Sequence, residues 1–162
     1  MRSGNWYGND TIWRTVLDLY KCWIFGDGEG RLHESSQRRF LGIVDGIIAG
    51  EGNGPLSPTA RGAGVVLAGL DPFAVDWAAA TLLGFDPQRV KILTQASQTR
   101  RVTLWSGRPD RIQCVSNVKS WNGSPDSLTE CLDFEPHFGW KGGLERPSRR
   151  RTTRDATAIT HP

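Results

Sequence analysis

The sequence predicts an α/β fold: a short, mostly parallel sheet flanked by helices, followed by a C-terminal hairpin and an irregular closing segment. Two observations lead to this class. Residues 40–49 and 64–70 form apolar runs without polar alternation, which is typical of strands covered on both faces. Residues 11–25 and 71–84 carry the spacing and the end signals of helices. A chain of 162 residues is about one domain long, and we expect that domain to span residues 1–145.

The first helix, at about residues 11–25, has apolar side chains at spacings of three and four along a broad stripe. Asn9 or Asp10 can cap its start, and Gly26 can end it. Cys22 falls outside the stripe without a neighbour that could act as its base, so we expect an inert thiol. The acids at 26–30 lack the later ligands of a calcium loop and indicate a flexible turn.

The apolar runs at 40–49 and 64–70 are expected to be adjacent, parallel strands, because a long connection without helical pattern separates them. The second run leads directly into Asp71-Pro72, an N-cap followed by proline. The helix that begins there should stop at Gly84.

Beyond this helix, Asp86-Pro87 repeats the same start signal for a shorter helix that runs to about Gln95. Residues 102–105 and 111–115 are expected as two strands with a hairpin-like connection between them. The stretch 120–143 is rich in Gly, Pro, Trp and acids, which indicates an ordered but irregular closing segment.

Charge is distributed unevenly along the chain. The formal net charge is +3 and the pI is about 9.0, yet residues 146–162 alone contribute +4. The body up to residue 145 therefore carries −1, and we expect no nucleic-acid binding by it. Residues 146–162 are expected to be a disordered, solvated tail. The alternative is that this Arg run attracts nucleic acid or an acidic membrane surface.

The cysteines limit the cofactors that this chain can hold. Its three cysteines are far apart and form no CxxC pair, so no iron–sulfur cluster is expected from this chain alone. Free thiols fit a reducing, cytoplasmic location. No apolar run approaches the roughly 18 residues of a membrane span, and the start lacks the apolar segment of a signal peptide.

The most informative stretch for function is the Gly-rich acidic segment at 45–55. Its central residues, expected as a loop after a buried strand, are the candidate ligand-binding positions: Gly50, Glu51, Gly52, Asn53 and Gly54. Glycines let a backbone approach a ligand closely, and successive N–H groups can bind an anion. The alternative is a sharp chain reversal in which Glu51 is solvated.

A divalent cation is the cofactor that the acids here could hold. Asp45, Glu51 and Asp76 would supply oxygen ligands from the strand, the loop and the neighbouring helix. The alternatives are that Asp45 accepts hydrogen bonds from the following backbone and that Asp76 is a helix-dipole acid.

A second group of possible metal ligands stands two residues apart, so that one face of a strand would present all of them: Cys131, Asp133, Glu135 and His137. Pro136 interrupts that strand, which weakens the case for a site.

Four segments resemble the "domain of unknown function 362" family. They are the runs GNWYGNDTIWR (4–14), IVDGIIAGEGNGP (43–55), DPFAVD (71–76) and PHFGWKG (136–142), and the resemblance covers about residues 4–145. Members of that family are typically longer, with an upstream α/β half, and some carry an iron–sulfur segment. The resemblance therefore implies that this chain is the C-terminal portion of such a protein.

Three functions remain open on this evidence. The chain is a metal- or anion-binding enzyme portion, a redox-associated accessory module, or an inactive truncated remnant or scaffold. The partners that the resemblance implies are the upstream α/β half or an iron–sulfur protein. Neither a reaction nor a substrate follows from the sequence.

Overall fold

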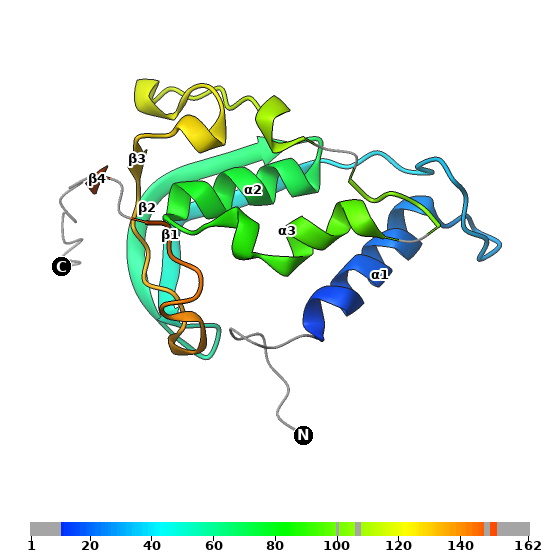
Figure 1. The fold of residues 1–162 in the computed structure, drawn as a ribbon, viewed down its shortest axis with the longest axis horizontal. Coiled ribbons are helices and arrows are strands. Elements are labelled where there is room, and N and C mark those ends of the chain that lie inside the picture. The colour runs from blue at the N-terminus through cyan, green and yellow to red at the C-terminus, as the bar shows by residue number, and fades with distance from the viewer. Residues whose placement is uncertain (1–10, 100, 106–107, 148–149, 152–162) are drawn as a thin grey trace, which may run out of the picture.

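The computed structural model describes residues 11–99, 101–105, 108–147 and 150–151 (Figure 1). The longer elements, in chain order, are α1 (Ile12–Phe25), β1 (Gly42–Asn53), β2 (Ser57–Gly69), α2 (Pro72–Leu83), α3 (Lys91–Gln95), β3 (Glu130–Cys131) and β4 (Arg150–Arg151). Short 3₁₀ turns occur along the rest of the described chain. The mixed α/β class is confirmed.

Strands β1 and β2 form one long antiparallel hairpin, with partners from Gly42↔Gly69 to Asn53↔Ser57 and an irregularity between Gly46 and Ile48. The expected parallel arrangement was wrong. Residues that were expected to form a long connection extend both strands instead, leaving a turn of only residues 54–56. A turn that short can join only antiparallel strands, because a parallel pair needs a crossover of a dozen or more residues. The parallel pair β3–β4 is two residues long.

The hairpin is covered on one face only. Its inner face packs beneath α2 and the closing segment, with Ala63 buried and Val65 and Leu67 half-buried (Figure 1). Its other face leaves large aliphatic side chains such as Ile48 exposed. The continuous apolar runs therefore do not reflect burial on both faces.

Helix α1 lies where the sequence predicts it, and Gly26 ends it with a backbone N–H donated to the Cys22 carbonyl. Cys22 is exposed. The expected caps Asn9 and Asp10 lie outside the described residues. No helix among the described residues is long and apolar enough to cross a membrane.

Helix α2 confirms its sequence signals at both ends. The Asp71 side chain accepts hydrogen bonds from the backbone N–H groups of Phe73 and Ala74, and Pro72 occupies the first turn. Gly84 closes the helix in the left-handed region, at φ 95°, where glycine is favoured. The next start signal also works, since the Asp86 side chain accepts from Gln88 N, but a 3₁₀ turn precedes the short α3.

Two clusters of buried side chains hold these elements together. The first joins α1, α2, α3 and residues 102–105: Leu17, Ile24, Phe25, Phe73, Trp77, Leu93, Ala96, Val102, Leu104 and Trp105. The second joins the inner hairpin face, the end of α2 and the closing segment: Ala63, Leu82, Trp121, Leu128, Leu132 and Phe134.

The C-terminal hairpin expected from residues 102–105 and 111–115 does not form among the described residues. Val102, Leu104 and Trp105 are buried in the first cluster, so their alternation serves core packing and not a strand ladder. Cys114 makes an isolated antiparallel bridge with Gly123. Residues 148–149 and 152–162 of the expected tail lie outside the described residues, and Arg150 and Arg151 pair with Glu130 and Cys131.

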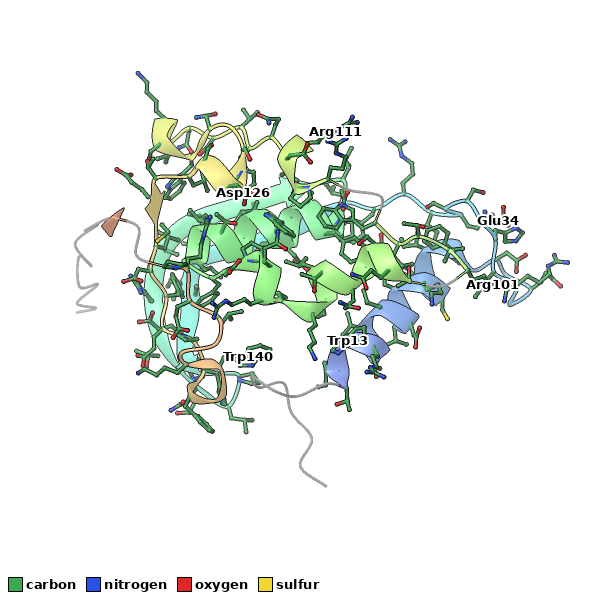
Figure 2. All side chains as sticks on the ribbon, viewed as in Figure 1. Trp13, Glu34, Arg101, Arg111, Asp126 and Trp140 are labelled. Atoms are coloured by element: carbon green, nitrogen blue, oxygen red, sulfur yellow. The ribbon has the colours of Figure 1, made fainter. Side chains whose placement is uncertain are left out.

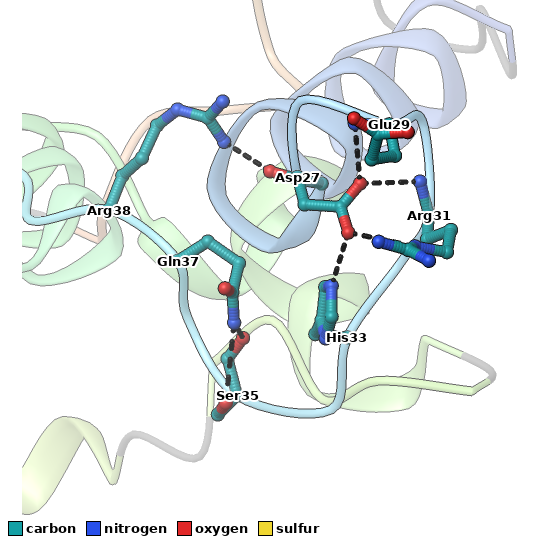
Figure 3. Close-up of polar contacts among 8 residues, drawn as sticks. Asp27, Glu29, Arg31, His33, Ser35, Gln37 and Arg38 are labelled. Atoms are coloured by element: carbon teal, nitrogen blue, oxygen red, sulfur yellow. Dashed lines mark hydrogen bonds and ion pairs between the residues drawn. The ribbon is translucent and has the colours of Figure 1, made fainter.

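The turn after α1 is organised by one carboxylate, Asp27 (Figure 3). Its oxygens accept hydrogen bonds from the backbone N–H groups of Glu29 and Arg31, and His33 Nε2 lies 2.7 Å from Oδ2. The hydrogen bond from His33 is the largest of the effects that hold the pKa of Asp27 far below its ordinary value. The Asp27 carboxylate therefore serves as a hydrogen-bond acceptor within the turn.

Candidate functional site

The expected ligand-binding loop is the end of β1 and the start of the hairpin turn. Glu51, Gly52 and Asn53 are strand residues paired with β2, and only Gly54 lies beyond the strand. Gly52 adopts φ 73°, and its N–H donates to the Glu135 carbonyl at 2.9 Å. The glycines here thus allow a close approach of the chain's own closing segment.

Glu51 faces the protein and not an open site. Its Oε2 accepts from Arg61 Nη1 at 2.7 Å and from the backbone N–H of Glu135 at 3.0 Å. Arg61 also donates to the Leu132 and Asp133 carbonyls. We call this group, formed by Glu51, Arg61 and the backbone of residues 132–135, the tip clamp.

The tip clamp joins charge, hydrogen bonding and an aromatic ring. The Arg61 guanidinium lies 4.7 Å from the centroid of Phe134, in addition to its contact with Glu51. Both charged side chains are partly shielded, with 34% of Arg61 and 18% of Glu51 exposed. Hydrogen bonds to charged groups contribute about 1.5–3 kcal/mol each, less when solvent reaches them. Sequence reasoning missed Arg61, because its partnership with Glu51 depends on the strand register.

Asp45 lies on the exposed face of β1, and its Oδ1 accepts from the backbone N–H of Ile47 at 3.1 Å. This is the backbone hydrogen bond that the sequence offered as the alternative to a metal ligand. Asp76 is exposed on α2, and partial desolvation by the surrounding chain raises the pKa of its carboxyl.

The structure does not bring Asp45, Glu51 and Asp76 together. Across the described part of the chain, no group of three or more His, Cys, Asp or Glu side chains could hold a metal ion. Glu51 is already occupied by Arg61, so a cation at the tip would have to displace an internal ion pair. Ligand binding near residues 50–54 stays a prediction.

The second candidate group is not one face of a strand, because β3 ends at Cys131. Asp133 adopts a left-handed φ of 53°, which breaks the alternation. Glu135 pairs with Lys141 at 3.0 Å, and His137 Nδ1 accepts from the backbone N–H of Gly139. These side chains serve the closing segment.

A groove of about 790 Å³ lies elsewhere, between the hairpin and the segment that follows residue 108. We call it the edge groove. One wall is the end of β2 from Gly64 to Gly69 together with Leu70, and the other is residues 111–118. Helix α2 contributes small or aliphatic side chains from between them: Ala74, Val75, Ala78 and Leu82. Nothing in the sequence predicted it, because its walls are far apart along the chain.

The two ends of the edge groove differ in chemistry. Near the end of β2, Trp105 Nε1 donates to Asp71 Oδ2 at 3.1 Å, and Arg108 and Arg111 contribute positive charge. At the other end the lining is apolar, with Trp121 and Leu128 from the second cluster. Burial raises the pKa of the Cys114 thiol in the wall, so this cysteine stays protonated.

Comparison with known proteins shows which sequences part of this chain is similar to. Residues 5–81 match the family "Domain of unknown function (DUF362)". The match includes α1, the whole β1–β2 hairpin and most of α2. The match lies in the N-terminal region of the chain and does not extend to residue 145, contrary to the expectation from the sequence. The position of the match therefore does not support the expectation that this chain is a C-terminal portion.

A thylakoid-associated protein of Synechocystis is 42% identical to this chain over 60 residues. The aligned stretch is 37% of this chain and 18% of that protein, so this chain matches less than a fifth of the relative's length. No solved structure matches the chain.

Proposed function

We propose that this chain is one part of a DUF362-type protein and that it docks a further α/β part of that protein through the exposed face of its hairpin. The observation that carries the proposal is a set of aliphatic side chains that we call the outer hairpin face: Ile43 (66% exposed), Ile47 (57%), Ile48 (64%) and Val66 (61%). Leaving these side chains in water forgoes the free energy that their burial would release.

The outer hairpin face is a sheet face that no other described element covers. A two-stranded sheet is marginal by itself and is stabilised by packing, yet only the inner face here is packed. Contiguous apolar patches on a folded surface mark interaction sites. Asp45, which lies between Ile43 and Ile47 on β1, is a carboxylate on the same face, and it accepts a hydrogen bond from the backbone N–H of Ile47.

A relative that is much longer than the aligned stretch is consistent with a further part of the protein. The relative from Synechocystis extends far beyond the aligned stretch, which is 18% of its length. An upstream α/β half, as the sequence resemblance implies, would supply the layer that covers the outer hairpin face. The three free cysteines, Cys22, Cys114 and Cys131, suit the reducing cytoplasm in which we place the assembly.

The metal- or anion-binding enzyme portion is secondary to this proposal. Any shared site would be completed only after docking, and within this chain Glu51 is engaged by Arg61. A redox-associated module draws on the family resemblance alone.

Co-expression with the coding region that precedes this chain tests the proposal. The upstream polypeptide should co-purify with the native chain and with Leu19→Asp, which alters an exposed leucine on α1 (66% exposed). Ile48→Asp should abolish co-purification, because it places a charge in the buried interface. The isolated chain should also bind an apolar dye less strongly once Ile48→Asp is introduced.

Two results would overturn the proposal. One is equal recovery of the upstream polypeptide with Ile48→Asp and with Leu19→Asp. The other is the lack of an α/β-coding region upstream together with an isolated chain that binds no apolar dye. Circular dichroism of each variant separates lost docking from lost folding.

A further inference from the structure

The edge groove runs along strand edges and not across a sheet face. Consecutive residues from Gly64 to Leu70 line one wall, and consecutive residues from 111 to 118 line the other. A pocket on a sheet face would be lined by alternate residues, because successive side chains point to opposite faces. At about 3.3 Å per residue, the six β2 residues from Gly64 to Gly69 offer an edge of roughly 20 Å.

The β2 wall offers unpaired backbone groups. Strand β2 pairs with β1 on one edge, and no further strand pairs with it among the described residues. An unpaired strand edge presents N–H and C=O groups that can pair with another chain.

The opposite wall is extended in the manner of a strand that lacks a neighbour. From Arg111 to Val118, exposed and half-buried residues alternate strictly, and the backbone angles at Ile112 (φ −67°, ψ 127°) and Val118 (φ −94°, ψ 112°) are extended. Period-two burial is typical of a strand in a sheet. Within the described part of the chain, this segment nevertheless has a single isolated bridge, at Cys114.

That bridge fixes which backbone groups point toward the groove. Cys114 exchanges both of its backbone hydrogen bonds with Gly123, N to O at 2.8 Å and O to N at 3.0 Å. In an extended chain the backbone groups of neighbouring residues point to opposite edges. The N–H and C=O groups of Gln113 and Val115 therefore point away from Gly123, toward the groove that both residues line. The Val115 side chain is 95% exposed.

We infer that the edge groove binds an extended strand of a separate polypeptide, paired to β2 and to residues 113–115 through its backbone. Main-chain hydrogen bonds of this kind give affinity, and pockets for alternate side chains give selectivity. Ala74 and Ala78 leave room for apolar side chains on the α2 side. The bound strand carries a carboxylate where it passes Arg111, which is exposed above the end of β2 (Figure 2).

The charged residues near Arg111, at the end of the groove beside Trp105, favour a negatively charged group in the bound strand. Arg108 is paired with Asp110 at 3.0 Å, and the Asp71 carboxylate accepts from Trp105 and from the first turn of α2. Arg111 lines the groove beside these groups, and, after the hydrogen bond from Arg108, its positive charge also contributes to lowering the pKa of Asp110. An acidic residue in the bound strand therefore complements it.

The test is a selection of random 12-residue displayed peptides on the whole chain, followed by binding measurements with the enriched peptides made synthetically. Enriched sequences should alternate apolar residues and contain Asp or Glu. They should slow hydrogen exchange at residues 64–70 and at 113–115. Replacing their central amides by N-methyl amides should abolish binding, because a strand pairs through its N–H groups.

Matched variants locate the site. Arg111→Glu should weaken binding of an acidic peptide about tenfold, whereas Arg101→Glu, an exposed arginine outside the groove, should not change it. Ala74→Leu should fill the groove and prevent binding, whereas Ala79→Leu on the same helix should bind normally.

Three outcomes would overturn the inference. They are no enrichment of any sequence, enriched peptides whose binding is insensitive to both Ala74→Leu and Arg111→Glu, and unchanged binding after N-methylation. The last outcome would show that the peptide binds through its side chains and not through strand pairing. Each outcome is independent of co-purification of the upstream polypeptide, because the outer hairpin face and the edge groove are altered by different variants.

Discussion

The two faces of the β1–β2 hairpin have similar compositions and opposite surroundings. On the inner face, Val65 and Leu67 pack with buried residues of α2 and the closing segment. On the outer face, Ile43 and Ile48 are mostly exposed. The contrast shows that apolar composition indicates which side chains a strand can bury. Whether they are buried depends on which other elements of the chain pack against that face.

Truncation of one side chain on each side of the sheet should give the largest difference. Leu82→Ala, which removes a buried contact of the inner face, should lower the free energy of unfolding by about 3 kcal/mol. Ile48→Ala should lower it by less than about 1 kcal/mol, because that side chain is already in water. Urea unfolding of both variants measures this, and equal losses would break the comparison.

The inner face also holds a polar contact, and its removal should have the next largest effect. Arg61→Met should cost about 2 kcal/mol, because it leaves Glu51 and two carbonyls without their shared donor. Glu51→Gln should cost about 1 kcal/mol, since an amide oxygen can still accept from Glu135 N. A double-mutant cycle should show coupling; additive losses would mean that the tip clamp does not act as one unit.

The carboxylate on the outer face provides the counterpart to Glu51. Asp45→Asn should change the free energy of unfolding by no more than about 0.5 kcal/mol, because an amide oxygen can accept from Ile47 N equally well in this exposed position. Thermal melts of Asp45→Asn and Glu51→Gln, measured together, compare the two faces directly. A loss at Asp45 as large as that at Glu51 would indicate a structural role for the outer carboxylate.

The smallest effect concerns Asp76 and depends on pH. Desolvation raises the pKa of this carboxyl above its ordinary 3.8, so the folded state holds the proton more tightly than the unfolded state does. Its penalty is therefore absent below pH 3.8 and grows as pH rises through the raised pKa. Asp76→Asn should remove that slope and give a gain within about 0.5 kcal/mol at pH 7. The measurement is the urea midpoint of both proteins as a function of pH. The prediction would be contradicted if the two curves, for the native protein and for Asp76→Asn, stayed parallel.

Local signals in the sequence were sufficient for the helices. Asp71 and Gly84 mark the two ends of α2, because capping depends on residues a few positions apart. Helix α1 could be predicted from the spacing of its own apolar residues. Strand direction was not predictable in the same way. Residues 49–63 contain many glycines and no obvious pattern, and only their pairing with each other shows that they extend the strands.

The candidate site was predicted in part. The sequence identified Glu51 as a candidate ligand-binding residue, and the structure places it near the hairpin tip. The pairing of Glu51 with Arg61 depends on the cross-strand register. The hydrogen bond that Glu51 accepts from the Glu135 backbone joins segments 84 residues apart. The edge groove depends on the same kind of long-range arrangement, because its two walls meet only in the folded chain.

The tip clamp has a consequence for the order in which the chain folds. Arg61 reaches carbonyls 71 and 72 residues further along, so its contacts close a loop that spans nearly half of the chain. Contacts of such long sequence separation form slowly, because the entropy of closing the loop is lost before the contact is gained. During synthesis, the hairpin emerges well before residues 132–135 exist to join it. Until residues 132–135 emerge, α2 is the only longer described element that can cover the inner face of the hairpin, and Arg61 lacks its carbonyl partners.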